Sequence, residues 1–542
     1  MTQQLSPSQE SPYQVRLVIR RAEIAEAPPS YQAQWAEGDG QISQPFTLKP
    51  PLTTEDAVDL KWYLEEYAEF VGAGTKVRAV EVEQKISEWG RALFDAIFHT
   101  VEGNNVYRNI LQAEEWGRPV LLTIGTTEPD VLGQPWELMR DRQGPLAFRG
   151  VSIRRQLTGS KPTRVLELRL PVRLLLIVSR PTDTDFIDPR TSVRPLLDGL
   201  DLLPKGSVEI EFCEPPTLGE LEERISKARR ARRPFHIVHF DGHGTYLSRL
   251  GVGALCFENK DRRVDYVTGE RLGDLMARLE VPVAILEACR TAEVSDKPVF
   301  GSVAPALLNS GVGSVVAFSH AVHIEAAKLL VERFYRRLVE GMTVGQALAE
   351  GRTRLRAVPG RWLTLGPNPP TVDLQDWFVP QLYQVGQDLG LIGGDVELGP
   401  VGEGETAPVL VRGWVERLRG FPPEPNYRFH GRAKELLELG RIFQEHNAVV
   451  VSGMGGMGKT ALSREAAAWW LRLGRFEQAV FCSFEQVQSV ERAVQVLGQA
   501  IEGLDFARRP AEDQRATAVE MFRGRRVLLV WDNFESTLAK FQ

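Results

Sequence analysis

The stretches HIVHFDGHG (236–244) and VAILEACRTAE (283–293) decide the fold of this chain. Each is an apolar run that ends in a reactive side chain, His243 in the first and Cys289 in the second. Such continuous apolar runs are typical of parallel strands that are covered on both faces. Reactive groups in open parallel sheets gather beyond the carboxyl ends of the strands, so we expect His243 and Cys289 to meet at one sheet edge.

The sequence around these stretches alternates predicted strands and helices. Apolar runs predict strands at 172–179, 235–240, 281–287 and 312–318, with helical patterns between them. This alternation is typical of a doubly wound α/β domain with a parallel sheet. We therefore predict an α/β core at 166–385.

Three further parts complete the predicted organisation. Residues 1–165 combine a strand pattern at 12–21 with a helical pattern at 53–115, and form an N-terminal strand and helix extension. Residues 386–426 are rich in Gly, Pro and Glu, which predicts a flexible linker. A second, incomplete α/β domain is expected at 427–542. Its predicted helices are 432–445 and 459–473, and its predicted strands are 448–452, 479–484 and 526–531.

Composition excludes several classes of function. The 65 Lys and Arg against 71 Asp and Glu give a net charge of −6, so we expect no general affinity for nucleic acid or anionic membranes. The basic run at 226–234 falls at a predicted helix C-terminus, which favours a solvated face. No apolar run is long enough to span a bilayer, and the polar N-terminus lacks the core of a secretion signal. The 4 cysteines lack paired metal-ligand spacing and fit a cytoplasmic protein.

The chemistry expected of His243 and Cys289 follows from their ordinary pKa values. A free cysteine at neutral pH is only a few per cent thiolate, so it needs a neighbouring base to act as a nucleophile. An imidazole can take the thiol proton and later protonate a leaving amine. Gly242 and Gly244 flank the histidine, which leaves space for a substrate and backbone N–H groups for an oxyanion. This pattern predicts a cysteine peptidase, whereas His236 and His239 are expected to pack inside the strand or to support the site from behind it.

The same residues resemble a known family. The motif EACRT, with a His-Gly pair upstream, is similar to the caspase signature. A longer ordered series resembles the CHAT domain, a caspase-like family related to separases, over about 15–385. Its members here are WYLEEY (62–67), LGQPWELM (132–139), HFDGHG (239–244), LEACRTAE (286–293) and VAPALLNSGVGSVVAF (303–318). The resemblance implies a caspase-like sheet, His243 as base, Cys289 as nucleophile, and the Gly244 and Cys289 backbone N–H groups as oxyanion donors.

Glu287 ends an otherwise apolar strand, where a buried carboxylate without a partner would be costly. Residues 287 and 289 share a direction in extended backbone. Related caspase-like families with basic specificity carry an acid at this position, which implies a primary pocket that favours Lys or Arg. The alternative is that Glu287 pairs with an internal arginine such as Arg290.

A second motif, VVVSGMGGMGKTAL (449–462), fits a phosphate-binding loop. Its glycines let backbone N–H groups surround phosphates, and the following helix N-terminus adds positive potential. Lys459 is expected to reach the β- and γ-phosphates, and the Thr460 hydroxyl to ligate Mg²⁺. The strand in RRVLLVWDNFE (525–535) ends at Asp532, the expected second group at the metal.

The stretch YRFHGRAKELLEL (427–439) resembles the lead-in of STAND NTPases of the NB-ARC type, in which Arg432 would border the nucleotide. The chain departs from that family at Asn533, where members often carry a second acid. Because the sequence stops ten residues after Asp532 (542 − 532), we expect a fragment that binds ATP or ADP and whose hydrolysis is open. The candidate nucleotide-binding residues are Arg432, Gly453, Met454, Gly455, Gly456, Met457, Gly458, Lys459, Thr460, Ala461 and Asp532.

Together the two resemblances imply a bacterial signalling, defence or cell-death protein. Nucleotide exchange would permit self-oligomerisation through the NTPase module, and clustering would activate the peptidase on a protein substrate. The alternative is a noncatalytic adaptor that only transmits assembly. A third interpretation is a constitutive peptidase with a vestigial phosphate-binding loop.

Overall fold

The computed structural model describes residues 12–22, 30–38, 40–68, 71–157, 170–204, 206–290, 300–320, 322–362, 371–388, 390, 414–424, 429–485 and 489–537, and at 288–290 it covers the backbone. The described residues up to Gly390, apart from Asp188–Arg190, form one compact unit. Those from Trp414 onward form a second unit.

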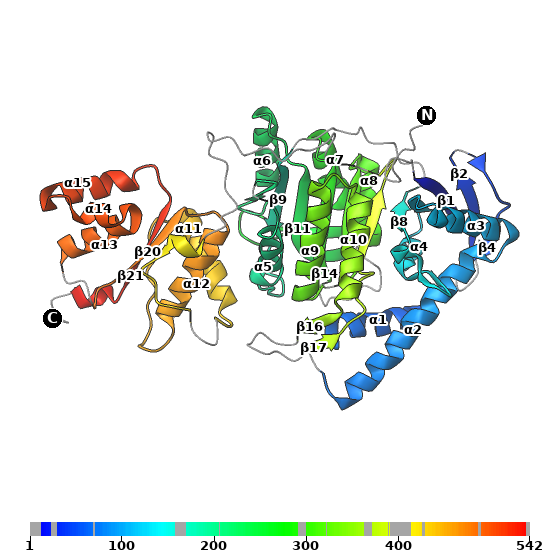
Figure 1. Cartoon of the computed structure of the whole chain (residues 1–542), viewed down its shortest axis with the longest axis horizontal. Coiled ribbons are helices and arrows are strands. Elements are labelled where there is room, and N and C mark those ends of the chain that lie inside the picture. Colours follow the sequence, from blue (N-terminus) through cyan, green and yellow to red (C-terminus); the bar gives the residue numbers. More distant parts are fainter. Residues whose placement is uncertain are drawn as a thin grey trace, which may run out of the picture. The chain divides into compact units, whose positions relative to one another are not determined.

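A large and mostly parallel sheet runs through the first unit (Figure 1). Among the described residues it holds 14 strands, which confirms the α/β class. Its central strands are β10 (Val208–Phe212), β9 (Val172–Val178), β11 (Ile237–Leu247), β14 (Val283–Arg290), β15 (Ser314–Phe318) and β18 (Pro380–Gln384), in that spatial order. The first five run parallel to one another, and β18 is antiparallel to β15.

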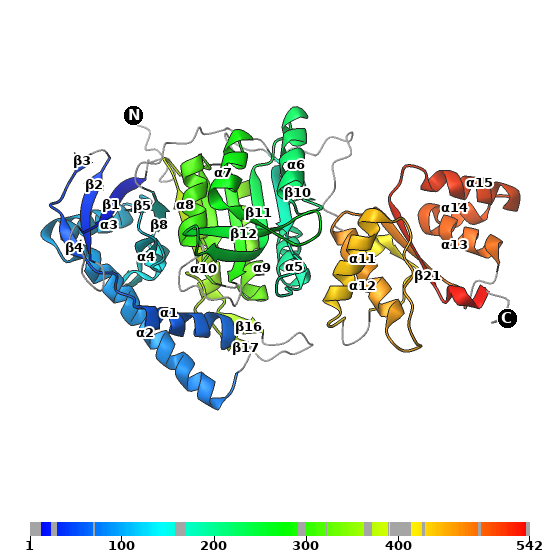
Figure 2. The ribbon, with the colours of Figure 1, turned by 180° about the vertical axis from the view of Figure 1, so that it is seen from behind.

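Helices cover both faces of these central strands (Figures 1 and 2). On one face, alternate residues of β11 such as Val238 and Phe240 join an apolar core with α6, α7 and α8. On the other face lie α9 and α10, which pack against each other. The bounds are α5 Pro189–Leu200, α6 Leu218–Arg230, α7 Gly269–Arg278, α8 Phe300–Ser310, α9 Ile324–Val339 and α10 Val344–Ala357. This is the doubly wound arrangement expected from the alternating pattern.

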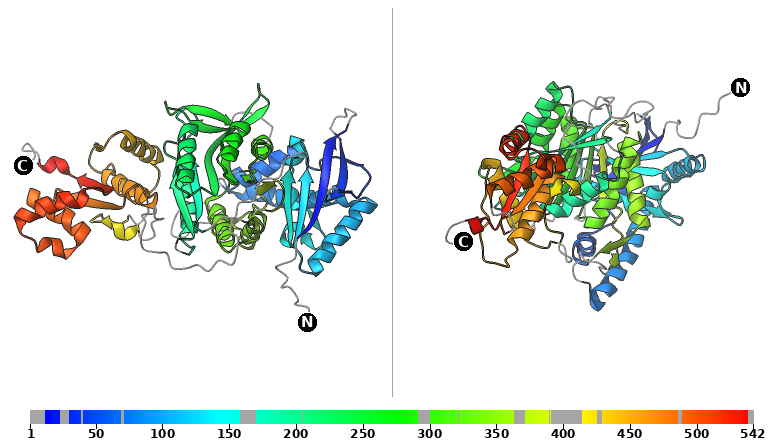
Figure 3. Two further views of the ribbon diagram at one scale, coloured as in Figure 1. Left: turned by 90° about the horizontal axis from the view of Figure 1, so that it is seen from above. Right: turned by 60° about the vertical axis from the view of Figure 1, so that its left-hand side comes forward.

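The N-terminal extension continues the same sheet. Within the sheet, the extension is joined to the core where β18 pairs with β8, at Tyr383 and Arg155. Figure 3 shows β1 and β2 at the end of the sheet, beside β5 and β8. The strands are β1 Tyr13–Arg21, β2 Tyr31–Glu37, β3 Gly40–Gln41, β4 Phe46–Leu48, β5 Val120–Gly125 and β8 Val151–Gln156. The extension therefore shares its backbone hydrogen bonding with the core.

The helical part of the extension begins where its sequence indicates. Thr53 and Asp56 form a capping box at α1, because each side chain accepts the other residue's backbone N–H at 3.2 and 2.9 Å. Asp59 of α1 pairs with Arg78 and Lys85 of α2, which holds α1 beside that long helix (Figure 1). The helices are α1 Thr54–Lys61, η2 Trp62–Glu66, α2 Ala73–Phe98, α3 Val101–Glu115, α4 Pro129–Leu132, η3 Trp136–Leu138 and η4 Leu146–Phe148. Two small hairpins are β6 Arg140–Asp141 with β7 Gly144–Pro145, and β16 Gly360–Trp362 with β17 Thr371–Asp373.

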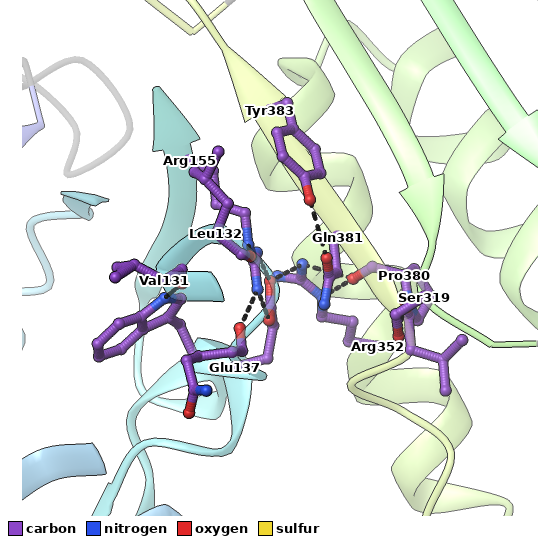
Figure 4. Close-up of polar contacts among 12 residues, drawn as sticks. Val131, Leu132, Glu137, Arg155, Ser319, Arg352, Pro380, Gln381 and Tyr383 are labelled. Carbon is purple, nitrogen blue, oxygen red and sulfur yellow. Dashed lines mark hydrogen bonds and ion pairs between the residues drawn. The ribbon is translucent and has the colours of Figure 1, made fainter. Parts of the chain in front are cut away.

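A buried ionic network ties the extension to the core (Figure 4). Glu137 of η3 accepts two bonds from Arg155 of β8, at 2.7 and 2.9 Å, and one from Arg352 of α10 at 3.0 Å. Arg352 also donates to the backbone oxygen of Pro380 at 2.7 Å. All three ionic side chains are almost fully buried. Because a buried charge without its partner is costly, this network fixes LGQPWELM against the sheet.

The second unit holds a smaller α/β arrangement. Strands β19 (Leu418–Arg419), β20 (Gln478–Ser483) and β21 (Val527–Asp532) form a parallel sheet among the described residues. The ring centroids of Phe443 on α11 and Trp470 on α12 are 5.1 Å apart, so these two helices pack together. The helices are η5 Val415–Arg417, α11 Ala433–Glu445, α12 Lys459–Arg472, α13 Val490–Glu502, α14 Leu504–Ala507, α15 Ala511–Phe522 and η6 Phe534–Thr537. The expected linker at 386–426 lies mostly outside the described residues.

The structure corrects the strand expected at 448–452. These residues form no strand in the described sheet, and Val450 is 90% exposed. An apolar run becomes a strand only when its backbone groups find ladder partners, and none of the described strands pairs with this run. The apolar residues 449–451 therefore led us to expect more burial than the structure has.

Two strand ends also differ from the expectation. β11 extends to Leu247 and β14 to Arg290, so His243 and Cys289 lie within strands and not beyond them. β11 continues because its residues from Gly244 onward pair with β12 (Val252–Glu258), which in turn pairs with β13 (Val264–Thr268). The hairpin supplies hydrogen-bond partners that the apolar pattern alone did not reveal.

Candidate active site and nucleotide site

The backbones of His243 and Cys289 lie side by side. β11 and β14 are parallel neighbours, and their register pairs His243 with Cys289. Neighbouring strands are about 4.8 Å apart in the hydrogen-bonding direction. Side chains at two paired positions of such strands can therefore reach each other. The fold thus brings together two residues that are 46 positions apart in sequence (289 − 243).

The His243 ring is held at one nitrogen. Its Nε2 lies 2.6 Å from the backbone oxygen of Asp185, in the loop after β9. A carbonyl oxygen can only accept, so the ring carries its hydrogen on Nε2 and its lone pair on Nδ1. Nδ1 is buried and has no hydrogen-bond partner among the described residues. This is the tautomer that a base needs if Nδ1 is to receive a proton.

Burial sets the protonation state of this histidine. His243 is 3% exposed, and removal from water lowers its pKa below the usual 6.5. The bond to the Asp185 carbonyl opposes that shift, while the charge of Arg180 adds to it. The imidazole is therefore neutral at pH 7 and able to accept a proton.

The two glycines beside His243 have different surroundings. A Cβ on Gly242 would lie 2.9 Å from the Phe240 ring and 3.1 Å from the Ser179 oxygen, so packing alone requires glycine there. Gly244, the expected oxyanion donor, pairs with Leu255 of β12. The substrate-approach role predicted for Gly242 is thus not needed to explain that glycine.

Glu287 has a neighbour that the sequence did not indicate. Its Oε2 lies 3.4 Å from Nε2 of His239, and its side chain is 17% exposed. Both His239 nitrogens and the hydroxyl of Tyr335 are buried without hydrogen-bond partners among the described residues. Burial and the Glu287 charge raise the pKa of Tyr335. His239 thus lies beside a half-buried carboxylate, whereas the side chain of Arg290, the other expected partner, lies outside the description.

The other cysteines are buried and unactivated. Burial raises the pKa of Cys213 and of Cys256 to about 12, and burial also raises the pKa of Cys482. All three are free thiols in packed positions.

The phosphate-binding motif forms a glycine-rich loop before α12. Gly453, Gly456 and Gly458 have φ of 159°, 78° and 79°, which glycine alone adopts readily. Lys459 begins α12 and its Nζ donates to the backbone oxygens of Gly453 and Met454, at 2.8 and 3.3 Å. A lysine that folds over its own loop in this way fits a phosphate at the loop centre.

The remaining nucleotide-site candidates meet at this loop. The Thr460 hydroxyl donates to Asp532, with its oxygen 3.0 and 3.1 Å from the two carboxylate oxygens. Arg432 donates from Nη1 to the Met457 oxygen at 2.9 Å. These residues are far apart in sequence, and a hydroxyl beside a carboxylate suits Mg²⁺. Among the described residues, no group of three or more His, Cys, Asp or Glu is arranged to hold a metal by itself.

Sequence reasoning missed the backbone oxygen of Asp185. Any residue can supply a carbonyl, so no residue type marks the position. His239 was expected to pack or to support the site, but its neighbour Glu287 could not be predicted, because that contact depends on the register of β11 against β14.

Comparisons with known proteins complete this description. The CHAT domain family profile matches residues 88–381, more than half of the chain. Two structures of the Saccharomyces cerevisiae separase–securin complex are 10% and 11% identical, each covering 69% of this chain and 30% of that chain, with TM-scores of 0.38. The Drosophila initiator caspase Dronc is 11% identical, covering 42% of this chain and 87% of that chain, with a TM-score of 0.22. No curated protein matches. None of the described helices is long and apolar enough to cross a membrane.

Proposed function

We propose that this chain, which belongs to the CHAT-domain family, is a caspase-like cysteine endopeptidase under nucleotide control. The observation that carries the proposal is the register of His243 with Cys289, together with the Nε2–H bond to Asp185. That bond leaves Nδ1 as a buried acceptor in the strand beside the nucleophile. A cysteine with such a neighbour is far more reactive than a free thiol.

The proposed reaction uses these groups in turn. Nδ1 of His243 takes the proton of the Cys289 thiol, and the thiolate sulfur forms a bond to the scissile carbonyl carbon. Backbone N–H groups of Gly244 and Cys289 donate to the resulting oxyanion. The imidazolium then protonates the leaving amine as the C–N bond breaks, and water hydrolyses the thioester with His243 again as the base.

Glu287 is proposed to favour Lys or Arg before the scissile bond. Its carboxylate is half-buried and lies beside a histidine, which leaves acceptor capacity for a cation. One nitrogen of a neutral His239 ring and the Tyr335 hydroxyl oxygen, both without hydrogen-bond partners among the described residues, add further acceptors. Pairing between Glu287 and Arg290 remains the alternative.

The second unit is proposed to be a STAND-type nucleotide module. Bound ATP with Mg²⁺ would supply a γ-phosphate that ADP lacks. Its presence or absence would distinguish two conformational states of the module. Lys459 and the loop backbone would hold the phosphates, and Thr460 and Asp532 would hold the metal. Arg432 would hold the loop itself. The contact of Thr460 with Asp532 supports this assignment. Self-oligomerisation through this module would then activate the peptidase on a protein substrate in the cytoplasm.

A covalent probe tests the peptidase proposal directly. The purified full chain is incubated with a mixture of peptidyl acyloxymethyl ketones that carry different side chains next to the warhead, with and without ATP and Mg²⁺. Mass spectrometry is expected to find the label on Cys289, and to find it strongly reduced in His243→Ala. Labelling that is spread over the cysteines, or that does not depend on His243, would favour the noncatalytic adaptor.

A further inference from the structure

The carbonyl that orients His243 belongs to a loop, residues 179–188, between β9 and α5. A loop carbonyl holds a ring only as firmly as the loop itself is held. Asp185 lies in the middle of this segment, and its oxygen is 2.6 Å from Nε2 of His243. The anchors of the loop therefore decide which nitrogen of the imidazole carries the proton.

Arg180 anchors both ends of the loop. Its Nη1 donates to the Ser179 oxygen at 2.8 Å, and its Nε donates to the Ile187 oxygen at 2.9 Å. Its Nη2 donates to Oδ2 of Asp241 at 2.8 Å. The guanidinium is thus shared between the loop and β11, and Asp241 lies two residues before His243 in that strand.

The Arg180–Asp241 pair is buried and further bonded. The side chains of Arg180 and Asp241 are 2% and 7% exposed. The Ser192 hydroxyl of α5 also donates to Oδ2 of Asp241, at 2.6 Å. Removal of one member of such a pair leaves a charge in a poorly solvated position. The peptidase chemistry described above assigns neither residue a role.

Two further hydrogen bonds hold residues 182 and 183 of the loop. Thr182 N–H donates to the Arg262 oxygen at 2.8 Å, and Val264 N–H donates to Oδ1 of Asp183 at 2.9 Å. The turn between β12 and β13 therefore fixes residues 182–183, while Arg180 fixes Ile187. Asp185 lies between these two attachments, so its carbonyl has little freedom to turn away.

We propose that Arg180 and Asp241 are positioning residues that hold the Asp185 carbonyl against His243 and so keep the imidazole in its Nε2–H form. This rests on the proposed role of His243 as the base. Only a planar guanidinium can donate to Ser179, Ile187 and Asp241 together, so lysine is not an equivalent. Loss of the clamp lets the ring turn or change tautomer, and Nδ1 is then no longer fixed as an acceptor in the strand next to Cys289.

The test measures how fast iodoacetamide alkylates Cys289 in the full chain between pH 5 and 9, with the modified peptide quantified by mass spectrometry. The charges that act on His243 are Arg180, Asp185 and Asp241, so the pH curve responds to the clamp. In Arg180→Lys and Asp241→Asn the rate at pH 7 is expected to fall about tenfold. The midpoint is expected to move towards about 8.5, the value of an ordinary cysteine.

Controls separate positioning from loss of folding. Arg361→Lys changes another buried arginine that pairs with a carboxylate, Asp376, at 2.6 and 2.7 Å, and it should leave the curve unchanged. Because Cys289 in an unfolded chain would also react as an ordinary cysteine, only variants whose circular dichroism matches that of the unaltered chain are compared. Ser192→Ala removes one bond to Asp241 and should shift the midpoint in the same direction, by less, even if Arg180→Lys does not fold.

The outcomes are distinct. If Arg180→Lys and Asp241→Asn fold and keep the unaltered curve while His243→Ala moves it, the clamp is wrong and the peptidase proposal stands. If His243→Ala also leaves the curve unchanged, the role of His243 as base is wrong, and the clamp falls with it.

Discussion

Cys289 of β14 stands opposite His243 of β11 in the register of two neighbouring parallel strands. The same register pairs Glu287 with Asp241, two residues earlier in each strand. The two carboxylates nevertheless have different partners, because Asp241 pairs with Arg180 and Glu287 lies beside His239. One acid thus has an arginine as its counter-charge, and the other has a histidine beside it.

The pH dependence of the peptidase follows from the burial of His243. Burial lowers the pKa of this imidazole below 6.5, so its neutral form, the form that acts as a base, persists at lower pH than for a free histidine. We expect the acid limb of kcat/KM for peptide cleavage to have its midpoint below pH 6.5. A midpoint above pH 6.5 would contradict the assignment of His243 as the base.

Glu287→Gln tests the specificity proposal. The change keeps the size of the side chain and removes its charge, so cleavage after Lys or Arg should fall about tenfold, or about 1.4 kcal/mol. Cleavage after small residues should be unchanged. The measurement is the cleavage profile of a peptide library, with Glu280→Gln, an exposed acid that pairs with Arg229, as the matched control. A profile of the unaltered protein that is dominated by acidic or small residues would remove the proposal.

Nucleotide binding is tested at the loop of the second unit. Lys459→Ala removes the side-chain cation that donates to the Gly453 oxygen of the loop, and should weaken ATP binding about tenfold or more in titration calorimetry. Asp532→Asn should keep ATP binding but weaken its dependence on Mg²⁺. Lys434→Ala, which removes the same charge from α11, is the control. Unchanged peptidase activity in Lys459→Ala would favour the constitutive peptidase with a vestigial loop.

The buried network of Figure 4 predicts a stability effect. Glu137→Gln leaves Arg155 and Arg352 buried without a counter-charge, and should cost about 3 kcal/mol or more of the free energy of unfolding. Glu340→Gln removes a partner of Arg337 at the surface and should cost less than about 1 kcal/mol. Urea denaturation of the full chain compares the two. Equal midpoints would show that the network does not hold the N-terminal extension in place.

Most of the fold could be predicted because its central strands are apolar and several of its helices begin with a threonine cap. Strand β9 was expected at 172–179 and lies at Val172–Val178, and α12 begins at Lys459 as its motif indicates. The failures concern partners that are distant in sequence. The run at 448–452 has the composition of a strand, but pairing and not composition decides whether a strand forms.

The candidate site, like the fold, could be predicted from the sequence only in part. His243 and Cys289 are marked by residue type and by their glycine and alanine neighbours, so their meeting could be expected from the parallel pattern. The Asp185 carbonyl and the Arg180 guanidinium could not, because a backbone oxygen has no signature in sequence and a lone arginine after a strand has many ordinary uses. Only the described contacts connect them to the histidine.

The central claim is that Cys289 cleaves proteins, and new protein N-termini in cells measure this most directly. Cells that produce the unaltered chain, Cys289→Ala, or Cys482→Ala as a control at a buried cysteine are compared by N-terminal proteomics after induction. The account predicts a set of new N-termini with the unaltered chain and with Cys482→Ala that is absent with Cys289→Ala. The same set of N-termini with Cys289→Ala would contradict it.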